Sequence, residues 1–169
     1  MAQKSSRHPK LPDQSEQNEK LFHNEAIKGS AANLGSLGEM MAALELMLQG
    51  WEIYTQSICN PSNSFDMLAV KDEIIKRIQV KSTSRRYKNG NRKNKKHIVK
   101  VCKRDRGGKS QYSKSDCDFI IIVLMDEGWF FVIPTEKFSS QTVSIYTNDE
   151  GQVSGWVAEY QDAWDLMDE

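Results

Sequence analysis

Four polar side chains stand out because they interrupt segments that are otherwise largely apolar. Asp66 lies in the segment FDMLAV, Gln79 and Lys81 close the segment IIKRIQVK, and Glu39 lies in the segment LGEMMAALELML. Carboxylate and amide oxygens are ligands of hard cations such as Mg²⁺, and a neighbouring lysine can orient a water or offset charge on a phosphate. The four residues are therefore candidates for one cation-dependent site.

A predicted β-hairpin would bring three of these residues together. Residues 65–70 and 74–81 are strand-like and are joined by a short polar connection, which is typical of a hairpin. Side chains alternate between the two faces of a strand, so Gln79 and Lys81 point the same way at the strand end. Asp66, at the start of the neighbouring strand, is expected to lie beside them.

Glu39 lies on a helix predicted over residues 37–49, which Gly50 ends in the C-cap position. The helix is apolar almost all round, and such a helix is normally buried on more than one side. A carboxylate there is costly to bury unless a cation or hydrogen-bond donors meet it. As an alternative, Ser36 and Glu39 fit the S-x-x-E capping box, in which the glutamate only satisfies backbone donors.

The other three residues also have ordinary structural interpretations. Asp66 is placed to bond the turn that precedes it, and Gln79 and Lys81 each fit a solvated sheet face. The order and spacing of all four residues together favour a shared site over these separate explanations.

The remaining apolar segments complete one domain, for which 169 residues are sufficient. The further predicted elements are strands over residues 51–55, 118–125 and 129–134 and a short terminal helix over residues 158–167. The strand at 118–125 is apolar enough to be central and buried on both faces. We predict a mixed α/β (α+β) domain over residues 33–169, preceded by a flexible arm over residues 1–32.

A dense block of positive charge is hidden by the net charge of zero. Residues 85–114 carry 13 Lys/Arg and one acid, a local charge of +12, whereas the rest of the chain carries 10 Lys/Arg and 22 acids. Such a block is typical of a surface that binds a polyanion, although a solvated loop is the alternative. We therefore treat residues 84–114 as a basic insert in the predicted domain.

Several side chains of the basic insert are candidates for contact with nucleic acid. The candidate phosphate contacts are Arg85, Arg86, Lys88, Arg92, Lys93, Lys95, Lys96, Lys103, Arg104 and Lys109. Tyr87 and Tyr112 are placed to stack on exposed bases, or else are plain surface or core aromatics. His97 is interpreted as a polar contact rather than as a general base.

The composition indicates the cellular compartment in which the protein is expected. The longest apolar run, residues 119–125, is too short to cross a bilayer, and the first 20 residues lack the apolar stretch of a secretory signal. The three cysteines form no C-x-x-C pair, so disulfide and zinc frameworks are both disfavoured. We expect a cytoplasmic protein that does not bind membranes.

The order of these motifs resembles that of the PD-(D/E)XK nuclease superfamily. The resemblance rests on Gly38-Glu39 in a helix, then Phe65-Asp66, then Gln79-Val80-Lys81 followed by Ser82. It covers roughly residues 34–138. It is nearest to small members of the superfamily, the archaeal Holliday-junction resolvases and the cyanobacterial group I intron homing endonuclease, which also has a Gln-x-Lys motif.

The resemblance implies a restriction-endonuclease-like core, with a central mixed sheet flanked by helices, and a role for each motif residue. Asp66 would be the central metal ligand and Glu39 an outer or water-mediated one. Gln79 would replace the second acid, the carbonyl of Val80 would add a ligand, and Lys81 would position the attacking water. The implied cofactor is Mg²⁺, with Mn²⁺ as a substitute.

Two functions from different classes follow. The first is a Mg²⁺-dependent DNA endonuclease, either homing-type or selective for branched junctions, acting as a homodimer or larger homo-oligomer. The second is a non-catalytic nucleic-acid-binding protein that keeps the fold, because Gln79 removes one negative charge from the metal site. A more distant third is RNA processing, or a protein-interaction role in which the acidic C-terminal third, including Asp162, Asp165 and Asp168, masks the basic insert or docks a partner.

Overall fold

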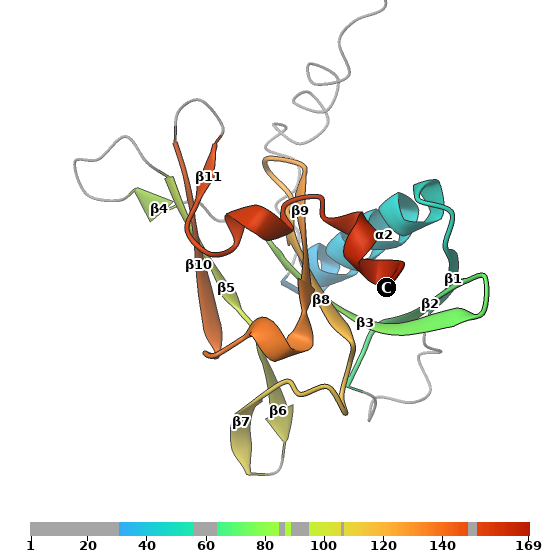
Figure 1. The fold of residues 1–169 in the computed structure, drawn as a ribbon. Helices are drawn as coiled ribbons and strands as arrows, with labels where there is room; N and C mark the ends of the chain where they lie inside the picture. Colours follow the sequence, from blue (N-terminus) through green and yellow to red (C-terminus); the bar gives the residue numbers. More distant parts are fainter. Residues whose placement is uncertain (1–30, 56–63, 85–86, 89–94, 106, 149–151) are drawn as a thin grey trace, which may run out of the picture.

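The computed structural model describes residues 31–55, 64–84, 87–88, 95–105, 107–148 and 152–169 (Figure 1). The predicted arm therefore lies almost wholly outside the described residues. The helices and strands are α2 (Ala31–Leu48), β1 (Glu52–Thr55), β2 (Met67–Lys71), β3 (Ile74–Thr83), β4 (Tyr87–Lys88), β5 (Lys95–Lys100), β6 (Cys102–Asp105), β7 (Gly108–Gln111), β8 (Phe119–Leu124), β9 (Trp129–Pro134), η1 (Thr135–Lys137), β10 (Thr142–Thr147), β11 (Val153–Ser154), η2 (Ala158–Tyr160) and η3 (Trp164–Met167).

The central sheet has five strands in the order β1-β2-β3-β8-β9. The pair β3–β8 is parallel and the other three pairs are antiparallel, so the sheet is mixed, as predicted. The hairpin of β2 and β3 is confirmed, and Asp72 in its turn has a φ of +48°. This fold class is therefore the mixed α+β class expected from the sequence.

Strand β8 lies between two hydrophobic cores, and all six of its side chains are buried. Its odd-numbered residues, such as Ile121, pack in a core shared with α2, and its even-numbered residues, such as Ile122, pack in a second core on the other face. The prediction of a central strand buried on both faces is confirmed.

The second face of the central sheet is covered mainly by strands, with Tyr160 of η2 beside them. A four-stranded sheet in the order β11-β10-β5-β4 packs there through Val99, Val143 and Ile145 (Figure 1). Helix α2, the α-helix of the described residues, flanks the opposite face of the central sheet. The basic insert supplies β4 and β5 to this sheet and also forms the β6–β7 hairpin.

Helix α2 begins six residues earlier than predicted and ends at the expected glycine. Gly50 has a φ of +87°, its N–H bonds the carbonyl of Met47, and the N–H of Trp51 bonds the carbonyl of Leu46. This is the Schellman arrangement that a left-handed C′ glycine allows. No described helix combines the length and the hydropathy that a membrane span needs.

One face of α2 is exposed, which corrects the prediction that the helix is buried on more than one side. Ala42 and Leu46 are fully buried against the sheet, but four large apolar side chains are 59–72% exposed: Met40, Leu44, Met47 and Leu48. The sheet offers one packing face, so an apolar helix lying on it buries one stripe only.

The terminal helix predicted over residues 158–167 is two short 3₁₀ segments, η2 and η3. Asp162 between them has a φ of +51°, which a continuous helix does not allow. Asp168 pairs with Lys71 on β2 at 2.8 Å. This acid therefore contacts the core hairpin, not the basic insert that it was suggested to mask.

Candidate active site

The candidate site forms where β3 runs beyond its neighbour β2. The last residue pair of these two strands is Met67 with Ile78, whereas β3 continues to Thr83 beside β8. The edge of β3 from Gln79 onward is therefore free of β2. Asp66 lies at this edge, and its own N–H still bonds the carbonyl of Ile78 at 2.8 Å.

The carboxylate of Asp66 takes the place of a missing strand partner at that edge. Its Oδ2 accepts a hydrogen bond from the backbone N–H of Val80 at 2.7 Å. The N–H and C=O of one strand residue point to the same edge, so the carbonyl of Val80 also faces this side. The carbonyl of Val80 and the carboxylate of Asp66 therefore lie at the same edge of β3.

Gln79 is buried, and its amide Nε2 donates to Oδ2 of Asp66 and to the carbonyl oxygen of Val80, the latter at 3.2 Å. Both partners are acceptors, so the amide must present its NH₂ group to them. A ligand role for Gln79 would instead use Oε1. In this conformation Gln79 directs its amide nitrogen, and not Oε1, toward Asp66 and the carbonyl of Val80, the other two candidate metal ligands.

Helix α2 reaches the same edge because Gly38 has no side chain. A Cβ at Gly38 would lie 2.4 Å from Cβ and 2.5 Å from Oγ of Ser82, which forbids any side chain at this separation. Oγ of Ser82 also donates to the carbonyl of Leu34 at 3.2 Å. This contact between α2 and β3 places the next helix residue, Glu39, at the open edge. Ser36 is inside the helix, so the capping-box alternative is wrong.

The four residues named first from the sequence line one pocket of about 570 Å³, together with Ser82 and residues of β5. Burial is the main cause that raises the pKa of Asp66, offset in part by Val80, Lys81 and Gln79. Burial, followed by the Asp66 carboxylate, raises the pKa of Glu39, and Lys81 lowers it in part. Two half-buried acids and one ammonium therefore lie within electrostatic reach of one another.

A family model described as PD-(D/E)XK endonuclease matches residues 30–167, which include all four residues. The chain belongs to this family. The predicted family membership is thereby confirmed. The match extends well beyond the segment over which the sequence motifs were recognised and takes in β10, β11 and both terminal 3₁₀ helices.

The fold of this family member is similar to that of a solved bacterial homing endonuclease, I-Ssp6803I. The TM-score is 0.65 at 22% sequence identity, over 82% of this chain and 93% of that one, so the likeness concerns the fold. A UPF0102 protein of Campylobacter fetus subsp. fetus (strain 82-40) is 36% identical over 69 residues. That match spans 41% of this chain and 62% of the relative.

The predicted phosphate contacts of the basic insert are only partly described. Arg85, Arg86, Arg92 and Lys93 lie outside the described residues, and for Lys88, Lys95 and Arg104 the backbone alone is described. Lys109 is exposed on β7. Nζ of Lys96 lies 5.4 Å from the ring centre of Tyr146, and Lys103 pairs with Asp116. Lys103 is thus already bonded to a carboxylate.

Lys100 also lines the pocket, although it was not among the predicted phosphate contacts. It is exposed at the end of β5 and lines the pocket with Ile98. Lys96, Ile98 and Lys100 alternate along β5 with buried His97 and Val99, which is the period-2 pattern of a strand with one buried face, and this pattern marks Lys100 as a side chain of the less buried face. Lys100 therefore adds an exposed cationic side chain to the lining of the pocket.

His97 is fully buried on β5 and does not line the pocket. Its Nδ1 lies 4.0 Å from Asp126, and its Nε2 lies 3.9 Å from Glu127, both in the turn between β8 and β9. These three side chains form a group of potential metal ligands. Its burial argues against a direct contact between His97 and a phosphate, and no general-base role in the pocket follows from its position.

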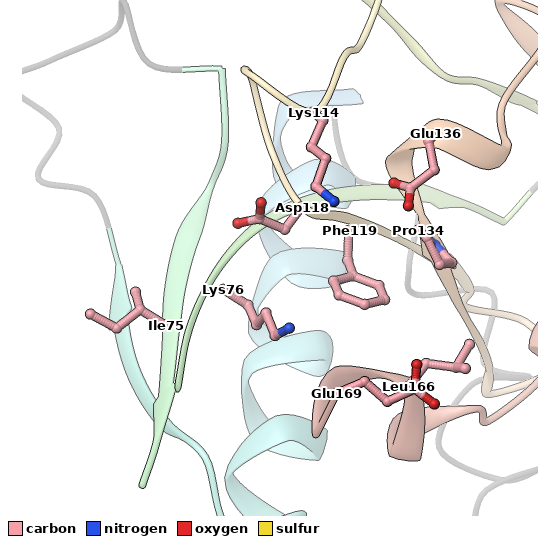
Figure 2. Close-up of a pocket in the computed structure, with 9 residues that line it drawn as sticks. All are labelled: Ile75, Lys76, Lys114, Asp118, Phe119, Pro134, Glu136, Leu166 and Glu169. Atoms are coloured by element: carbon pink, nitrogen blue, oxygen red, sulfur yellow. The ribbon is translucent and has the colours of Figure 1, made fainter. Parts of the chain in front are cut away.

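A second pocket of about 300 Å³ lies at the other end of β3 and is shown in Figure 2. It lies beside Lys76, Phe119 and Leu166, and Nζ of Lys76 is 5.7 Å from the centre of the Phe119 ring. Asp118 at its edge is bonded to Arg77 through both carboxylate oxygens. This pocket also holds acids and lysines, but none of the four residues of the family motif lines it. The larger pocket contains all four and is therefore the candidate active site of this PD-(D/E)XK family member.

Proposed function

We propose that this chain is a Mg²⁺-dependent DNA endonuclease that hydrolyses phosphodiester bonds, with Mn²⁺ as a substitute cation. The observation that carries the proposal is the meeting of Glu39, Asp66, Gln79 and Lys81 in one pocket at the open edge of β3. Membership of an endonuclease family supports the same reaction class.

The donor set at the edge of β3 fits a hard cation. Asp66 Oδ2 and the carbonyl oxygen of Val80 already converge on one positively polarised group, the NH₂ of Gln79. A cation prefers the same two oxygens, and the amide of Gln79, turned over, offers Oε1 in place of its nitrogen. Glu39 supplies the second carboxylate of the pocket, directly or through water.

Each protein group then has a task in hydrolysis. A bound Mg²⁺ supplies stabilisation of charge on the phosphate and activation of water. The carboxylates of Asp66 and Glu39 provide the negative charge that holds the cation, and Nζ of Lys81 orients the water toward phosphorus. Lys100 offsets charge on a neighbouring phosphate at the pocket mouth.

Gln79→Glu should bind Mg²⁺ about tenfold more tightly than wild type, because a second carboxylate beside Asp66 adds charge to the ligand set. Without the cation the variant should melt at a lower temperature, since the bond from Gln79 to Asp66 is replaced by repulsion between two carboxylates. Isothermal titration calorimetry of DNA-free protein measures the affinity, and differential scanning fluorimetry measures the melting temperature.

Gln49→Glu is the matched control for this change. Gln49 follows α2, is exposed, and lies outside the pocket lining. The substitution Gln49→Glu therefore adds the same negative charge to the protein at a position away from the site. Equal Mg²⁺ affinity in wild type and Gln79→Glu would show that residue 79 does not contact the cation.

Lys100→Ala should weaken DNA binding and reduce the slope of log affinity against log salt concentration by about 1, the effect of one lost phosphate contact. Lys137→Ala, which removes an exposed lysine of η1, should leave the slope unchanged. Fluorescence anisotropy of a labelled duplex over a range of salt concentrations gives both slopes. Identical slopes for the two variants would remove Lys100 from the DNA-binding surface.

Incubation of the purified chain with plasmid, linear, branched and single-stranded DNA tests the proposed function. We expect cleavage that requires Mg²⁺ and stops when the cation is chelated. The set of substrates also distinguishes a homing-type from a junction-selective enzyme. Because cutting both strands at one locus takes two sites, we extend the proposal to a homodimer or larger homo-oligomer, which light scattering measures; a monomer on cleavable DNA would reject this extension.

The second candidate is a non-catalytic nucleic-acid-binding protein that retains the nuclease fold. The neutral Gln79, bonded through its nitrogen to Asp66, favours it, because the metal site then has fewer charges than two strand carboxylates would give. Salt-sensitive binding of DNA that needs no Mg²⁺ and never leads to cleavage would establish this function instead.

A further inference from the structure

The ring of Tyr112 lies against the lysine of the proposed active site. Nζ of Lys81 is 5.3 Å from the centre of this ring, within the range of a cation–π interaction. Burial, followed by the Asp66 carboxylate, raises the pKa of Tyr112, so the ring is also within electrostatic reach of the proposed metal ligand. Tyr112 belongs to the basic insert, which therefore contacts the lysine of the site.

The chain around Tyr112 is firmly held. The carboxylate of Asp116 accepts bonds from the N–H of Ser113 at 2.9 Å and from its hydroxyl at 2.7 Å. The ammonium of Lys103 on β6 bonds the other oxygen of Asp116 at 2.5 Å. Burial opposes ionisation of Asp116, but the bonds from Lys103 and Ser113 outweigh it and lower its pKa.

The ammonium of a lysine stays at one position only if a neighbouring group restricts its side chain. Its four-carbon stem has many rotamers, and an ammonium at a pocket mouth gains by extending into water. The negative face of an aromatic ring attracts the ammonium and reduces that freedom. Tyr112 is half-buried and packs against the core between the two sheets, so its ring is a stationary surface.

We propose that Tyr112 is a positioning residue that holds the ammonium of Lys81 over the pocket, beside Asp66 and Glu39. The inference rests on the proposed function, because it assigns Lys81 its place in hydrolysis. It also gives the basic insert a second role, since the segment that follows the β6–β7 hairpin completes the site. Stacking of Tyr112 on a DNA base is disfavoured, because Lys81 occupies one face of the ring and the side chain packs against the core.

Single-turnover cleavage at saturating DNA tests the role of Tyr112. Tyr112→Leu should lower the rate about tenfold, since a desolvated cation–π contact is lost, with DNA affinity unchanged. Tyr112→Phe keeps the ring and should retain nearly the wild-type rate. Tyr146→Leu is the matched control, because its ring lies 5.4 Å from Nζ of Lys96, outside the pocket lining, and it should cut at the wild-type rate.

A second measurement does not depend on cleavage. In NMR spectra of the DNA-free protein, the ring current of Tyr112 should shift the Hε protons of Lys81 upfield. Tyr112→Leu should abolish the shift and Tyr112→Phe should preserve it. Unchanged Lys81 resonances in Tyr112→Leu would overturn the proposal.

The outcomes separate this proposal from the proposed function. If wild type cuts no DNA, the proposed function fails. If wild type and Tyr112→Leu cut equally fast, only the role of Tyr112 fails. A Tyr112→Phe variant as slow as Tyr112→Leu would assign the effect to the hydroxyl, and a loss of DNA affinity at an unchanged saturated rate would assign it to base stacking; both results overturn positioning by the ring.

Discussion

Asp66→Asn should lower the single-turnover rate of DNA cleavage by about a thousandfold or more, the scale on which single catalytic groups contribute. Asparagine keeps the shape of the side chain and an oxygen for the N–H of Val80, which now bonds Asp66 at 2.7 Å. It removes the charge that the proposed cation needs. Rates are measured on a cleavable substrate at saturating DNA.

Loss of folding is not expected to explain the result. Burial raises the pKa of Asp66, so at neutral pH the ionised carboxylate destabilises the fold, and this cost falls as pH drops through the raised pKa. Removing the charge relieves the cost, and the melting temperature of the metal-free variant should stay at or above that of wild type. DNA affinity should be retained, because a negative charge has been removed from the DNA-facing pocket.

Asp72→Asn is the matched control. Asp72 is exposed in the β2–β3 turn with a φ of +48°, a conformation that asparagine also tolerates. It loses the same charge without touching the pocket and should cut at the wild-type rate. If Asp66→Asn cuts as fast as Asp72→Asn, Asp66 has no part in catalysis.

Gly38→Ala should destabilise the protein by about 3 kcal/mol, the cost of a strongly overpacked contact. The added Cβ would lie 2.4 Å from Cβ of Ser82, so α2 must move away from β3. Glu39 moves with the helix, and cleavage should fall as well. Urea denaturation followed by circular dichroism measures the change in free energy of unfolding.

Two further variants identify the cause of the loss. Gly35 lies one turn earlier in α2 with nothing within 4 Å of an added Cβ, so Gly35→Ala should stabilise the protein by about 0.5–1 kcal/mol through helix propensity. Ser82→Gly removes the obstructing atoms, after which the nearest remaining Ser82 atom, its Cα, is 3.8 Å away. The double variant Gly38→Ala/Ser82→Gly should therefore recover part of the stability lost by Gly38→Ala, and strictly additive effects would contradict the close approach.

Local patterns predicted the half of the site that lies on one hairpin. Alternation along β3 and a short polar turn suffice to place Gln79 and Lys81 on one face beside Asp66, because these contacts are close in sequence. The even apolar content of residues 119–124 likewise identified β8 as central. Glu39 was selected by the cost of a carboxylate in an apolar helix, and its place in the pocket depends on Gly38 meeting Ser82, 44 positions later in the chain.

Contacts between distant segments were not predictable in this way. The amide of Gln79 faces Asp66 with its nitrogen because two acceptors meet there, which a single strand does not reveal. The exposed apolar face of α2 was not predicted, because apolar residues all round a helix do not show how many other elements pack against that helix. The pairing of β5 with β10 placed Lys100 at the pocket, and Tyr112 reached Lys81 only through the packing of the insert.

The parallel pairing of β3 with β8 also bears on how the chain folds. The β2–β3 hairpin is local and forms on the microsecond scale, whereas β8 can dock only after residues 84–118 have closed a long loop. Until then Phe119–Leu124, an uncharged β-prone segment without proline, is unpaired and prone to aggregate. The basic insert is separated from this segment by four residues, which include Asp116 and Asp118, and carries a charge of +12, so the like charges near the segment oppose the stacking of two copies of it during this interval. The residues proposed to hold DNA in the folded protein thus act as gatekeepers while it folds.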